Sequence, residues 1–283
     1  MKEFKDKVAV VTGGASGIGR AIVEKCLKEE MKVVIADVEE KVLRKTEQEL
    51  KAEGGKLLAV VTDVSKASDI EALADKTLEA FGSADLLCNN AGVGGGTTIW
   101  ESSLSDWEWV MGVNLWGVIY GVRTFVPIML EQGREAHIVN TASMAGLINH
   151  ANTGIYNLTK HAVVSLSETL HHELAERNSK VKVSVLCPGL VKTQILDSAR
   201  NRPANIENPL QMSAEEQKRY QAWSQALQNS MPPEKIADAV MQAVREEKFY
   251  ILTHQKMKPM IEARMQEILQ ERNPTDPLAG TGM

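Results

Sequence analysis

The sequence predicts a single doubly wound α/β domain, in which helices cover both faces of a mainly parallel sheet. Along its 283 residues, short β-branched apolar runs alternate with longer amphipathic stretches, which is the pattern of repeated βα units. The apolar runs are continuous, so both faces of their strands should be covered. No break in composition divides the chain, and 43% hydrophobic residues suffice for a large core.

Each expected element follows from its own stretch of sequence. Runs rich in Val, Ile and Leu predict strands within 7–13, 32–37, 56–63, 84–92, 137–143, 181–189 and 249–253. The intervening stretches repeat apolar residues at helical spacing and predict helices at 18–30, 39–54, 67–82, 154–174 and 235–247. Strand and helix therefore alternate through most of the chain.

Two segments depart from this alternation. A less regular insert at about 190–232 follows the strand that ends near Cys187. Ligands bind outside the carboxyl ends of strands in open α/β sheets, so the insert is placed to cover a site, although a plain surface excursion is the alternative. The C-terminal extension, about 253–283, ends in a tail that is expected to be loose or ordered by a neighbouring subunit. Its segment 248–270 is expected to pack beside the substrate pocket rather than on a membrane.

Composition and charge exclude several partners. The net charge is −5 with scattered Lys and Arg, which does not suit nucleic acid. No run approaches the roughly 18 uninterrupted apolar residues of a membrane span. Cys26, Cys88 and Cys187 lie apart in apolar segments and predict buried thiols. We expect a cytoplasmic protein that binds neither membrane nor nucleic acid, and the histidine spacing predicts no catalytic metal.

A glycine-rich turn joins the first strand to the first helix. The stretch TGGASGIGR contains Gly13, Ser16, Gly17, Ile18 and Gly19. Glycines let the backbone approach a pyrophosphate closely, and a helix N-terminus offers unpaired N–H groups. The stretch lacks the GK[ST] ending of a nucleotide-triphosphate loop, which argues against a kinase or ATPase. It therefore predicts a dinucleotide site.

Asp37 ends the second strand about twenty residues beyond these glycines. A carboxylate at this place accepts hydrogen bonds from an adenosine ribose. A 2′-phosphate would meet like charge, and neither Ser16 nor Val38 is basic. The sequence thus predicts NAD(H) over NADP(H), with simple capping of the next helix by Asp37 as the alternative.

Tyr156 and Lys160 lie four residues apart in the stretch YNLTK, within the helix predicted at 154–174. Side chains at this spacing share one face of a helix, so both can meet one ligand. A single pair of this kind occurs easily by chance.

The motifs TGGASGIG, NNAG and YNLTK occur in this order, and from about residue 5 to about 252 the chain closely resembles the short-chain dehydrogenases/reductases. The resemblance implies a Rossmann-type domain with a seven-stranded parallel sheet. It also implies four active-site residues, which are Asn114, Ser143, Tyr156 and Lys160. The implied cofactor contacts further include Asp63, Val64, Asn90, Ala91, Gly92, Pro188, Gly189, Val191 and Thr193.

These residues suggest how an alcohol proton is handled during hydride transfer to a nicotinamide. Tyr156 is the expected acid/base, and its ordinary pKa of about 10 must be lowered. A cation at ~4 Å supplies about 4 kcal/mol at a dielectric of ~20, so Lys160 is expected to lower the pKa of Tyr156 by up to ~3 units. Ser143 should donate to the substrate oxygen. As in the family, Lys160 should hold the nicotinamide ribose and Asn114 a relay water.

The expected function is NAD-preferring interconversion of a moderately apolar secondary alcohol and ketone. Its pocket walls are expected at 93–97, at 144–150 and in the insert, with Met144, Leu147, Ile148, Ile195 and Leu196. Alternatives are a noncatalytic dinucleotide-binding sensor or scaffold, and an epimerase or dehydratase with the same Tyr and Lys pair. The resemblance implies a homo-oligomer, a tetramer or a dimer. Trp100, Trp107, Trp109 and Trp116 are expected to form a cluster for packing or a subunit interface.

Overall fold

The structure is a computed structural model that describes residues 1–95, 98–203, 206 and 214–279. These residues form a seven-stranded parallel sheet with the order β3-β2-β1-β4-β5-β6-β7. The strands are β1 (Val8–Thr12), β2 (Lys32–Asp37), β3 (Leu57–Val61), β4 (Leu86–Asn89), β5 (Ala136–Thr141), β6 (Val181–Leu186) and β7 (Tyr250–Ile251). The doubly wound fold class and the seven-stranded sheet are confirmed.

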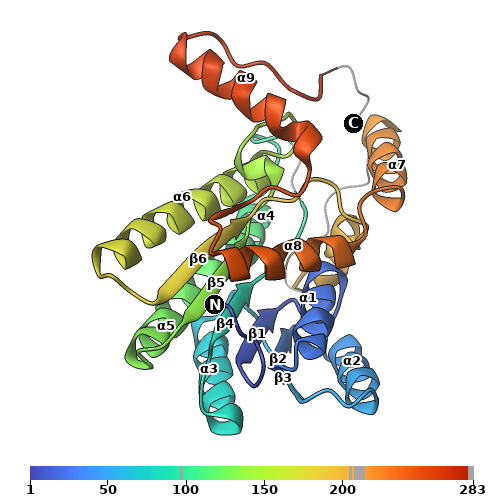
Figure 1. Cartoon of the computed structure of the whole chain (residues 1–283). Coiled ribbons are helices and arrows are strands. Elements are labelled where there is room, and N and C mark those ends of the chain that lie inside the picture. The colour runs from blue at the N-terminus through green and yellow to red at the C-terminus, as the bar shows by residue number, and fades with distance from the viewer. Residues whose placement is uncertain (96–97, 204–205, 207–213, 280–283) are drawn as a thin grey trace.

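Helices cover both faces of the sheet (Figure 1). One face carries α1 (Gly17–Lys28), α2 (Glu40–Ala52) and α8 (Pro233–Glu246), whose buried residues join one core cluster. The other carries α3 (Ala67–Phe81), α5 (Gly117–Glu131) and α6 (Gly154–Glu176), which contribute to the second. Alternate strand residues serve the two clusters, because Val11 belongs to the first and Val10 to the second.

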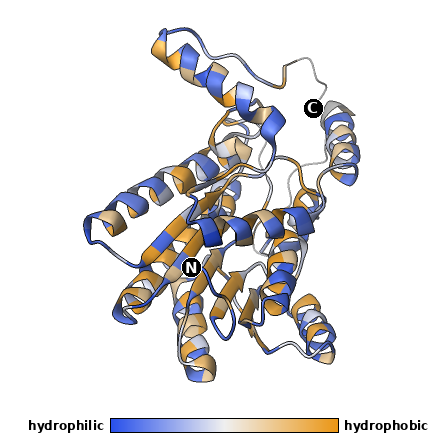
Figure 2. Cartoon of the chain, viewed as in Figure 1, coloured by the Kyte–Doolittle hydropathy of each residue, from blue (hydrophilic) through white to orange (hydrophobic). Residues whose placement is uncertain are grey.

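The sheet is the apolar middle layer of the domain. Figure 2 shows hydrophobic strands between helices whose outer faces are hydrophilic. All five residues of β1 and all six of β5 are buried. This burial on both faces explains why the strands read as continuous apolar runs.

The strand order reverses direction between β1 and β4. From β1 the chain proceeds outward through β2 to β3, then returns to β4 on the other side of β1. Loops that follow β1 and β4 therefore diverge at the carboxyl edge and leave a crevice, which is where such sheets bind ligands. The glycine-rich turn and the residues after Asn89 border this crevice.

The insert is more regular than expected. It contains a short 3-10 segment, η3 (Ile195–Asn201), and a fifteen-residue helix, α7 (Ala214–Gln228). Charged and polar residues dominate α7, so the sequence offers little apolar periodicity from which to predict this helix. Parts of the predicted insert and of the predicted pocket wall at 93–97 lie outside the described residues.

The C-terminal extension forms a helix beyond the last strand. Helix α9 (Lys258–Leu269) projects beyond the sheet layers in Figure 1, and its apolar Ile268 and Leu269 are 56% and 76% exposed. The start of the extension packs at the carboxyl edge, where Met257 lies against Gly189. Helix α9 itself buries only Glu267, so its expected packing beside the substrate pocket stays a prediction.

One helical run, Leu104–Glu131, is long and apolar enough to cross a membrane by length and composition. It consists of α4 (Leu104–Met111), the π-helix η1 (Gly112–Trp116) and α5. The buried side of α5 packs on the sheet through Phe125 and Met129, as the core helix of a domain does. Of the four tryptophans, Trp109 is buried while Trp100 is 81% exposed, so their role in packing or in a subunit interface stays a prediction.

The cysteine expectation agrees with the described residues. Cys26, Cys88 and Cys187 are buried free thiols. Among the residues that the structure describes, no group of His, Cys, Asp and Glu is arranged to hold a metal ion.

Candidate active site

The glycine-rich turn is a tight cradle at the start of α1. Gly13 and Gly17 have φ values of 63° and 54°, a backbone conformation that favours glycine. A Cβ on Gly19 would overlap the carbonyl oxygen of Gly13. Ser16 occupies the N-cap position without a side-chain capping bond, so the first N–H groups of α1 point toward the crevice.

Asp37 lies at the end of β2 and faces this cradle. Its Oδ2 accepts a hydrogen bond from the N–H of Ala15 at 3.1 Å, and its Oδ1 accepts one from the N–H of Glu39 at 3.0 Å. Burial raises the pKa of the Asp37 carboxyl, and the two N–H donors oppose that rise. Glu39, not Asp37, is the N-cap residue of α2. Each carboxylate oxygen keeps a lone pair for a further donor.

The segment after β4 ties three strands together. The side-chain amide of Asn90 donates to the Thr12 carbonyl at 3.0 Å, and the Thr12 hydroxyl accepts from the N–H groups of Asn90 and Ala91. Asn89 donates to the side chain of Asn140 on β5 at 2.9 Å. Asn89 and Asn90 thereby fix the spacing of the central strands, as expected for NNAG.

Asp63 and Val64 follow β3. Asp63 accepts hydrogen bonds from the backbone and hydroxyl of Ser65, which lower its pKa against the effect of burial. Val64 is buried under Gly117 of α5. The predicted contact of this pair with adenine stays a prediction.

Asn114 is fully buried in the π-helix η1, between α4 and α5. Its Oδ1 accepts from the N–H of Val93 at 2.8 Å, and its Nδ2 donates to the carbonyl of Val93 at 2.9 Å. The side chain therefore holds the backbone that follows Gly92. Single π-turns inside helices occur frequently at functional sites. The relay water stays a prediction.

Ser143 follows β5 and contacts the loop after β6. Its Oγ accepts from the N–H of Ala145 at 3.1 Å and donates to the carbonyl of Pro188 at 3.4 Å. The same carbonyl accepts from the N–H of Met144 at 2.8 Å. Ser143 and the Pro188–Gly189 loop are thus held as one unit.

Tyr156 and Lys160 share one face of α6 and meet the other site residues. The Ser143 side chain lies near enough to the Tyr156 hydroxyl to favour its ionised form. Nζ of Lys160 lies 5.5 Å from the centre of the Tyr156 ring and donates to the carbonyl of Thr141 at 3.0 Å. A Cβ on Gly92 would lie 3.5 Å from Nζ of Lys160 and 3.4 Å from Oδ1 of Asn114. The structure therefore brings all four predicted residues together.

The electrostatics differ from the expectation. Burial raises the pKa of Tyr156, and the Ser143 side chain opposes that rise. Burial also lowers the pKa of Lys160 to about 8. The predicted lowering of the Tyr156 pKa is not observed, because burial of the Tyr156 hydroxyl outweighs the group that favours its ionised form.

His254 is a site residue that the sequence reasoning missed. Its Nδ1 accepts from the N–H of Gly189 at 3.0 Å, so its Nε2 carries the proton and donates to the carbonyl of Leu190 at 3.0 Å. The imidazole thus fixes the loop that also holds Ser143. A lone histidine just past the last strand gives no sequence signal, because its partners lie more than sixty residues away.

The mouth of the site brings together three distant segments. The His150 ring stacks on Trp223 of α7 with centroids 5.8 Å apart. The carboxylate of Asp276 in the tail accepts from the N–H of Ala151 at 3.0 Å. Both contacts flank the segment that leads into Tyr156, and Trp223 belongs to the insert that was predicted to cover the site.

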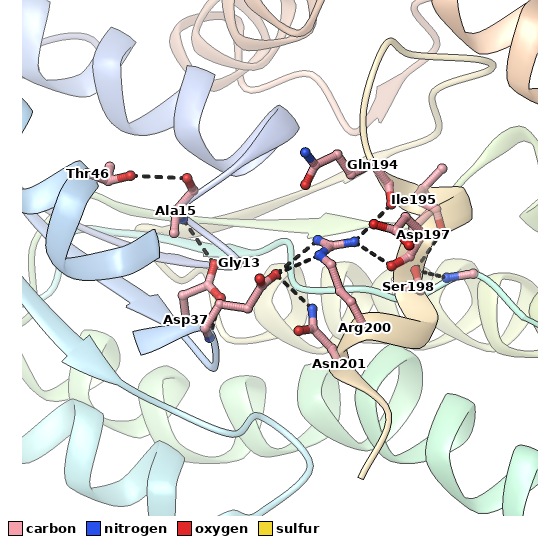
Figure 3. Close-up of polar contacts among 12 residues, drawn as sticks. Gly13, Ala15, Asp37, Thr46, Gln194, Ile195, Asp197, Ser198, Arg200 and Asn201 are labelled. Atoms are coloured by element: carbon pink, nitrogen blue, oxygen red, sulfur yellow. Dashed lines mark hydrogen bonds and ion pairs between the residues drawn. The ribbon is translucent and has the colours of Figure 1, made fainter. Parts of the chain in front are cut away.

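The insert that was predicted to cover the site begins with a strap, defined as residues 193–202, that crosses the crevice. Ser198 accepts from the N–H of Gly94 at 2.9 Å, and Thr193 lies against Gly17 of the cradle. Farther along, Arg200 binds Glu39 with Nε and Oε1 3.0 Å apart. Figure 3 shows Arg200 and Asn201 reaching from η3 toward the end of β2, where Asp37 lies.

These residues fit a dinucleotide. The cradle leaves no room for a side chain at Gly19, a helix N-terminus faces it, and a buried carboxylate stands at the end of β2. Close backbone approach suits a pyrophosphate, and the carboxylate suits a ribose hydroxyl. Val191 and Thr193 lie where the strap begins, between the Gly189 loop and Gly17.

Comparisons with known proteins agree with this geometry. A model of the family described as short chain dehydrogenase matches residues 7–204. A solved short chain dehydrogenase/reductase from Burkholderia phymatum, in complex with NAD, is 48% identical; it superimposes with a TM-score of 0.95 and covers 99% of this chain and 100% of its own.

Two curated relatives extend the comparison over most of the chain. The "CLA biosynthesis dehydrogenase/reductase" of Lactiplantibacillus plantarum is 36% identical and covers 97% of each chain. The 1-deoxy-11-beta-hydroxypentalenate dehydrogenase of Streptomyces exfoliatus is 34% identical and covers 89% of this chain and 84% of its own.

Proposed function

Because the chain belongs to the short-chain dehydrogenase/reductase family, a family of oxidoreductases that use a dinucleotide, we propose that it prefers NAD(H) and interconverts a moderately apolar secondary alcohol and its ketone. The observation that carries this proposal is the placement of Tyr156 beside Ser143 and Lys160, together with the glycine cradle and the buried Asp37. All four tetrad positions are filled, which disfavours a noncatalytic sensor.

A bound oxidised nicotinamide would supply the hydride acceptor for the alcohol carbon. In the oxidative direction Tyr156, which must be ionised, takes the alcohol proton as the hydride leaves. Ser143 hydrogen bonds to the substrate oxygen and stabilises the charge that develops there. Lys160 favours the tyrosinate while its own amine is protonated, and it binds the nicotinamide ribose. In the reductive direction the same groups return the proton.

The NAD preference rests on the charge at the end of β2. Asp37 is a buried carboxylate held by two backbone N–H groups, so it cannot turn away from a ligand at this place. A ribose hydroxyl can donate to it, whereas a 2′-phosphate would face like charge. The relative from Burkholderia phymatum is itself in complex with NAD, which supports the same preference here.

The substrate class rests on the residues near Tyr156. Met144 and Ile148 are buried beside Ser143, and Leu147, Ile195 and Leu196 are partly exposed. The stacked His150 and Trp223 add an aromatic border. Such walls suit a carbon skeleton with few charges. A curated relative named for a hydroxylated pentalenate supports a bulky secondary alcohol.

We also propose that the protein is a homo-oligomer, with a tetramer as the expected form. Trp116 and Leu158, on the helical runs that carry Asn114 and Tyr156, are each 45% exposed, and paired apolar faces of this kind suit a subunit interface. Light scattering at micromolar concentration tests the assembly. A monomer would contradict it.

The function is tested by titrating the protein with NADH and with NADPH while following nicotinamide fluorescence, and then by assaying secondary alcohols with NAD. Tight NADH binding, weak NADPH binding and net formation of NADH support the proposal. Product formation without net redox change would indicate an epimerase or dehydratase. Binding of neither dinucleotide would favour a protein without this cofactor.

A further inference from the structure

The strap spans the carboxyl edge of the sheet from β4 to β2. Ser198 is joined to Gly94, which follows β4, and Arg200 is joined to Glu39, which follows β2. Since β1 lies between β4 and β2 in the sheet, this part of the strap passes over the glycine turn that follows β1. Its two anchors therefore stand on either side of the proposed dinucleotide site.

Glu39 is the anchor on the adenosine side. Its Oε1 accepts from Nε of Arg200 at 3.0 Å and from Nδ2 of Asn201 at 2.9 Å, and Nη2 of Arg200 also lies 3.0 Å away. The side chains of Glu39 and Arg200 are 23% and 27% exposed. This partial shielding, with two donors on one guanidinium, makes the pair stronger than an ordinary surface ion pair.

The same pair sits next to the ribose-recognition carboxylate. The N–H of Glu39 donates to Oδ1 of Asp37, so the two carboxylates belong to one turn. The guanidinium of Arg200 is held there on one side by Glu39 and on the other by the carbonyls of Gln194 and Asp197, at 3.1 and 2.7 Å. Figure 3 shows this arrangement, with Arg200 between the strap and the end of β2.

We propose that Glu39 is a second determinant of dinucleotide selectivity, because it binds the arginine that would otherwise pair with a 2′-phosphate. Arginine matches a phosphate with two parallel donors. Glu39 occupies the Nε and Nη2 edge that such a pairing needs, and it holds the strap over the ribose at the same time. Asp37 thus repels the 2′-phosphate directly, and Glu39 occupies the Arg200 guanidinium with which that phosphate would otherwise pair. This inference rests on the proposed dinucleotide function.

A set of variants distinguishes the two roles of Glu39, which are to occupy Arg200 and to hold the strap over the ribose. Glu39→Gln removes the charge that holds Arg200, so the affinity for NADPH should rise about tenfold, a change of about 1.4 kcal/mol. Arg200→Gln breaks the same contact but removes the cation, so NADPH should gain nothing. The double variant Glu39→Gln/Arg200→Gln should lose the gain of the first. NADH should bind each variant a few-fold more weakly, because the strap is released.

The measurement is the dissociation constant of NADH and of NADPH from fluorescence titration of each purified full-length variant. Glu47→Gln is the matched control, because Glu47 lies on α2 and, among the residues that the structure describes, forms its ion pairs with Arg44 and Lys51 of the same helix. Circular dichroism verifies that each variant is folded. A variant that fails to fold is replaced by Glu39→Ala or Arg200→Met, which break the same contact.

The outcomes are distinct. An NADPH gain in Glu39→Gln that disappears in the double variant supports the inference. A gain that persists in the double variant overturns it, since removal of negative charge alone would then suffice. Equal loss of NADH affinity in both single variants without any NADPH gain also overturns it and leaves Glu39 as a strap anchor. A wild-type protein that binds neither dinucleotide would instead refute the proposed function.

Discussion

The two halves of the active site are built in different ways. The dinucleotide half consists of the turn after β1, the end of β2 and the start of the loop after β4, and backbone groups make most of its contacts. The reaction half joins α6, the loops after β5 and β6, α7 and the tail through side chains such as Ser143, Trp223 and His254. The residues of the first half directly follow strands of the sheet, whereas the second half depends on contacts among loops, helices and the tail.

This difference between the two halves predicts which variants change dinucleotide binding and which change the chemical step. A cradle that uses backbone N–H groups is sensitive to any added Cβ but needs few particular side chains. The reaction half needs one hydroxyl, one amine and one aromatic acid/base at defined positions. Changes in the first half should therefore act on dinucleotide affinity, whereas changes in the second should act on turnover.

The largest effect is expected for Tyr156→Phe. The variant removes the hydroxyl that accepts or returns the alcohol proton, so kcat should fall at least about 10³-fold, within the range of general acid–base catalysis. NADH should bind within about threefold of wild type, since the cradle and Asp37 are unchanged. Stopped-flow single-turnover rates and fluorescence titration measure the two quantities. Retained turnover would show that Tyr156 is not the acid/base.

More of the dinucleotide half than of the reaction half could be predicted from the sequence. The cradle glycines and Asp37 follow a strand directly and stand at a fixed spacing, so their position follows from the βα pattern alone. The spacing of Tyr156 and Lys160 on one helix was ambiguous by itself, and the resemblance carried by TGGASGIG, NNAG and YNLTK assigned them to the active site. His254, Trp223 and Arg200 were missed, because their partners lie 65, 73 and 161 residues away and no local pattern marks them.

The regularity of α7 and the placement of α9 could not be predicted from the sequence, for one physical reason. The helix α7 carries few apolar residues, and α9 exposes most of those it has, so periodicity predicted neither the regularity of the first nor the placement of the second. The direction of the Tyr156 pKa was also missed. A sequence reveals the neighbouring charge of Lys160 but not the depth at which both groups are buried.

The next largest effect is expected for Gly19→Ala in the dinucleotide half. The new Cβ would overlap the carbonyl oxygen of Gly13, so the turn must open and its N–H groups lose their convergence. NADH affinity should fall about 100-fold, or about 2.7 kcal/mol. Isothermal titration calorimetry measures the loss.

Gly133→Ala is the control for this variant. It changes a positive-φ glycine just before β5, at the amino edge of the sheet, where the added Cβ would meet only a carbonyl oxygen at 4.0 Å. Strain at this glycine lowers stability without reaching the crevice. Equal losses of NADH affinity in the two variants would argue against a specific cradle.

A smaller effect is expected for His254→Phe in the reaction half. The variant removes the acceptor for the Gly189 N–H and the donor to the Leu190 carbonyl, which loosens the loop that holds Ser143 through Pro188. We expect kcat to fall about tenfold, because near-attack geometry is sensitive to small shifts, while the dissociation constant of NADH changes less than about threefold. His254→Asn, which can retain the acceptor to Gly189, should recover most of kcat. Equal activities of the Phe and Asn variants would exclude a positioning role.

The smallest effect is on the free energy of unfolding. It concerns Lys160, a residue that lowers stability but is needed for turnover. The pKa of Lys160 is about 8 in the folded protein, below its ordinary value of 10.5, because burial disfavours the ammonium. Between pH 8 and pH 10.5 the unfolded chain binds more protons at Lys160 than the folded protein does, so the free energy of unfolding rises with pH across this window. Below pH 8 the full cost of burying the ammonium is present. Lys160→Met removes a penalty of about 3 kcal/mol and loses a hydrogen bond to Thr141 worth about 1 kcal/mol.

We therefore expect Lys160→Met to raise the melting temperature at pH 7 by about 2–6 °C, and to lose this advantage as the pH approaches 10.5. The same variant should be nearly inactive, because neither Tyr156 nor the nicotinamide ribose retains its cation. Differential scanning calorimetry from pH 7 to pH 10 measures the first effect. A variant that is less stable than wild type at pH 7 would mean that the Thr141 contact outweighs the desolvation of the amine, and the reaction half would then be a source of stability rather than a site where stability is given up for catalysis.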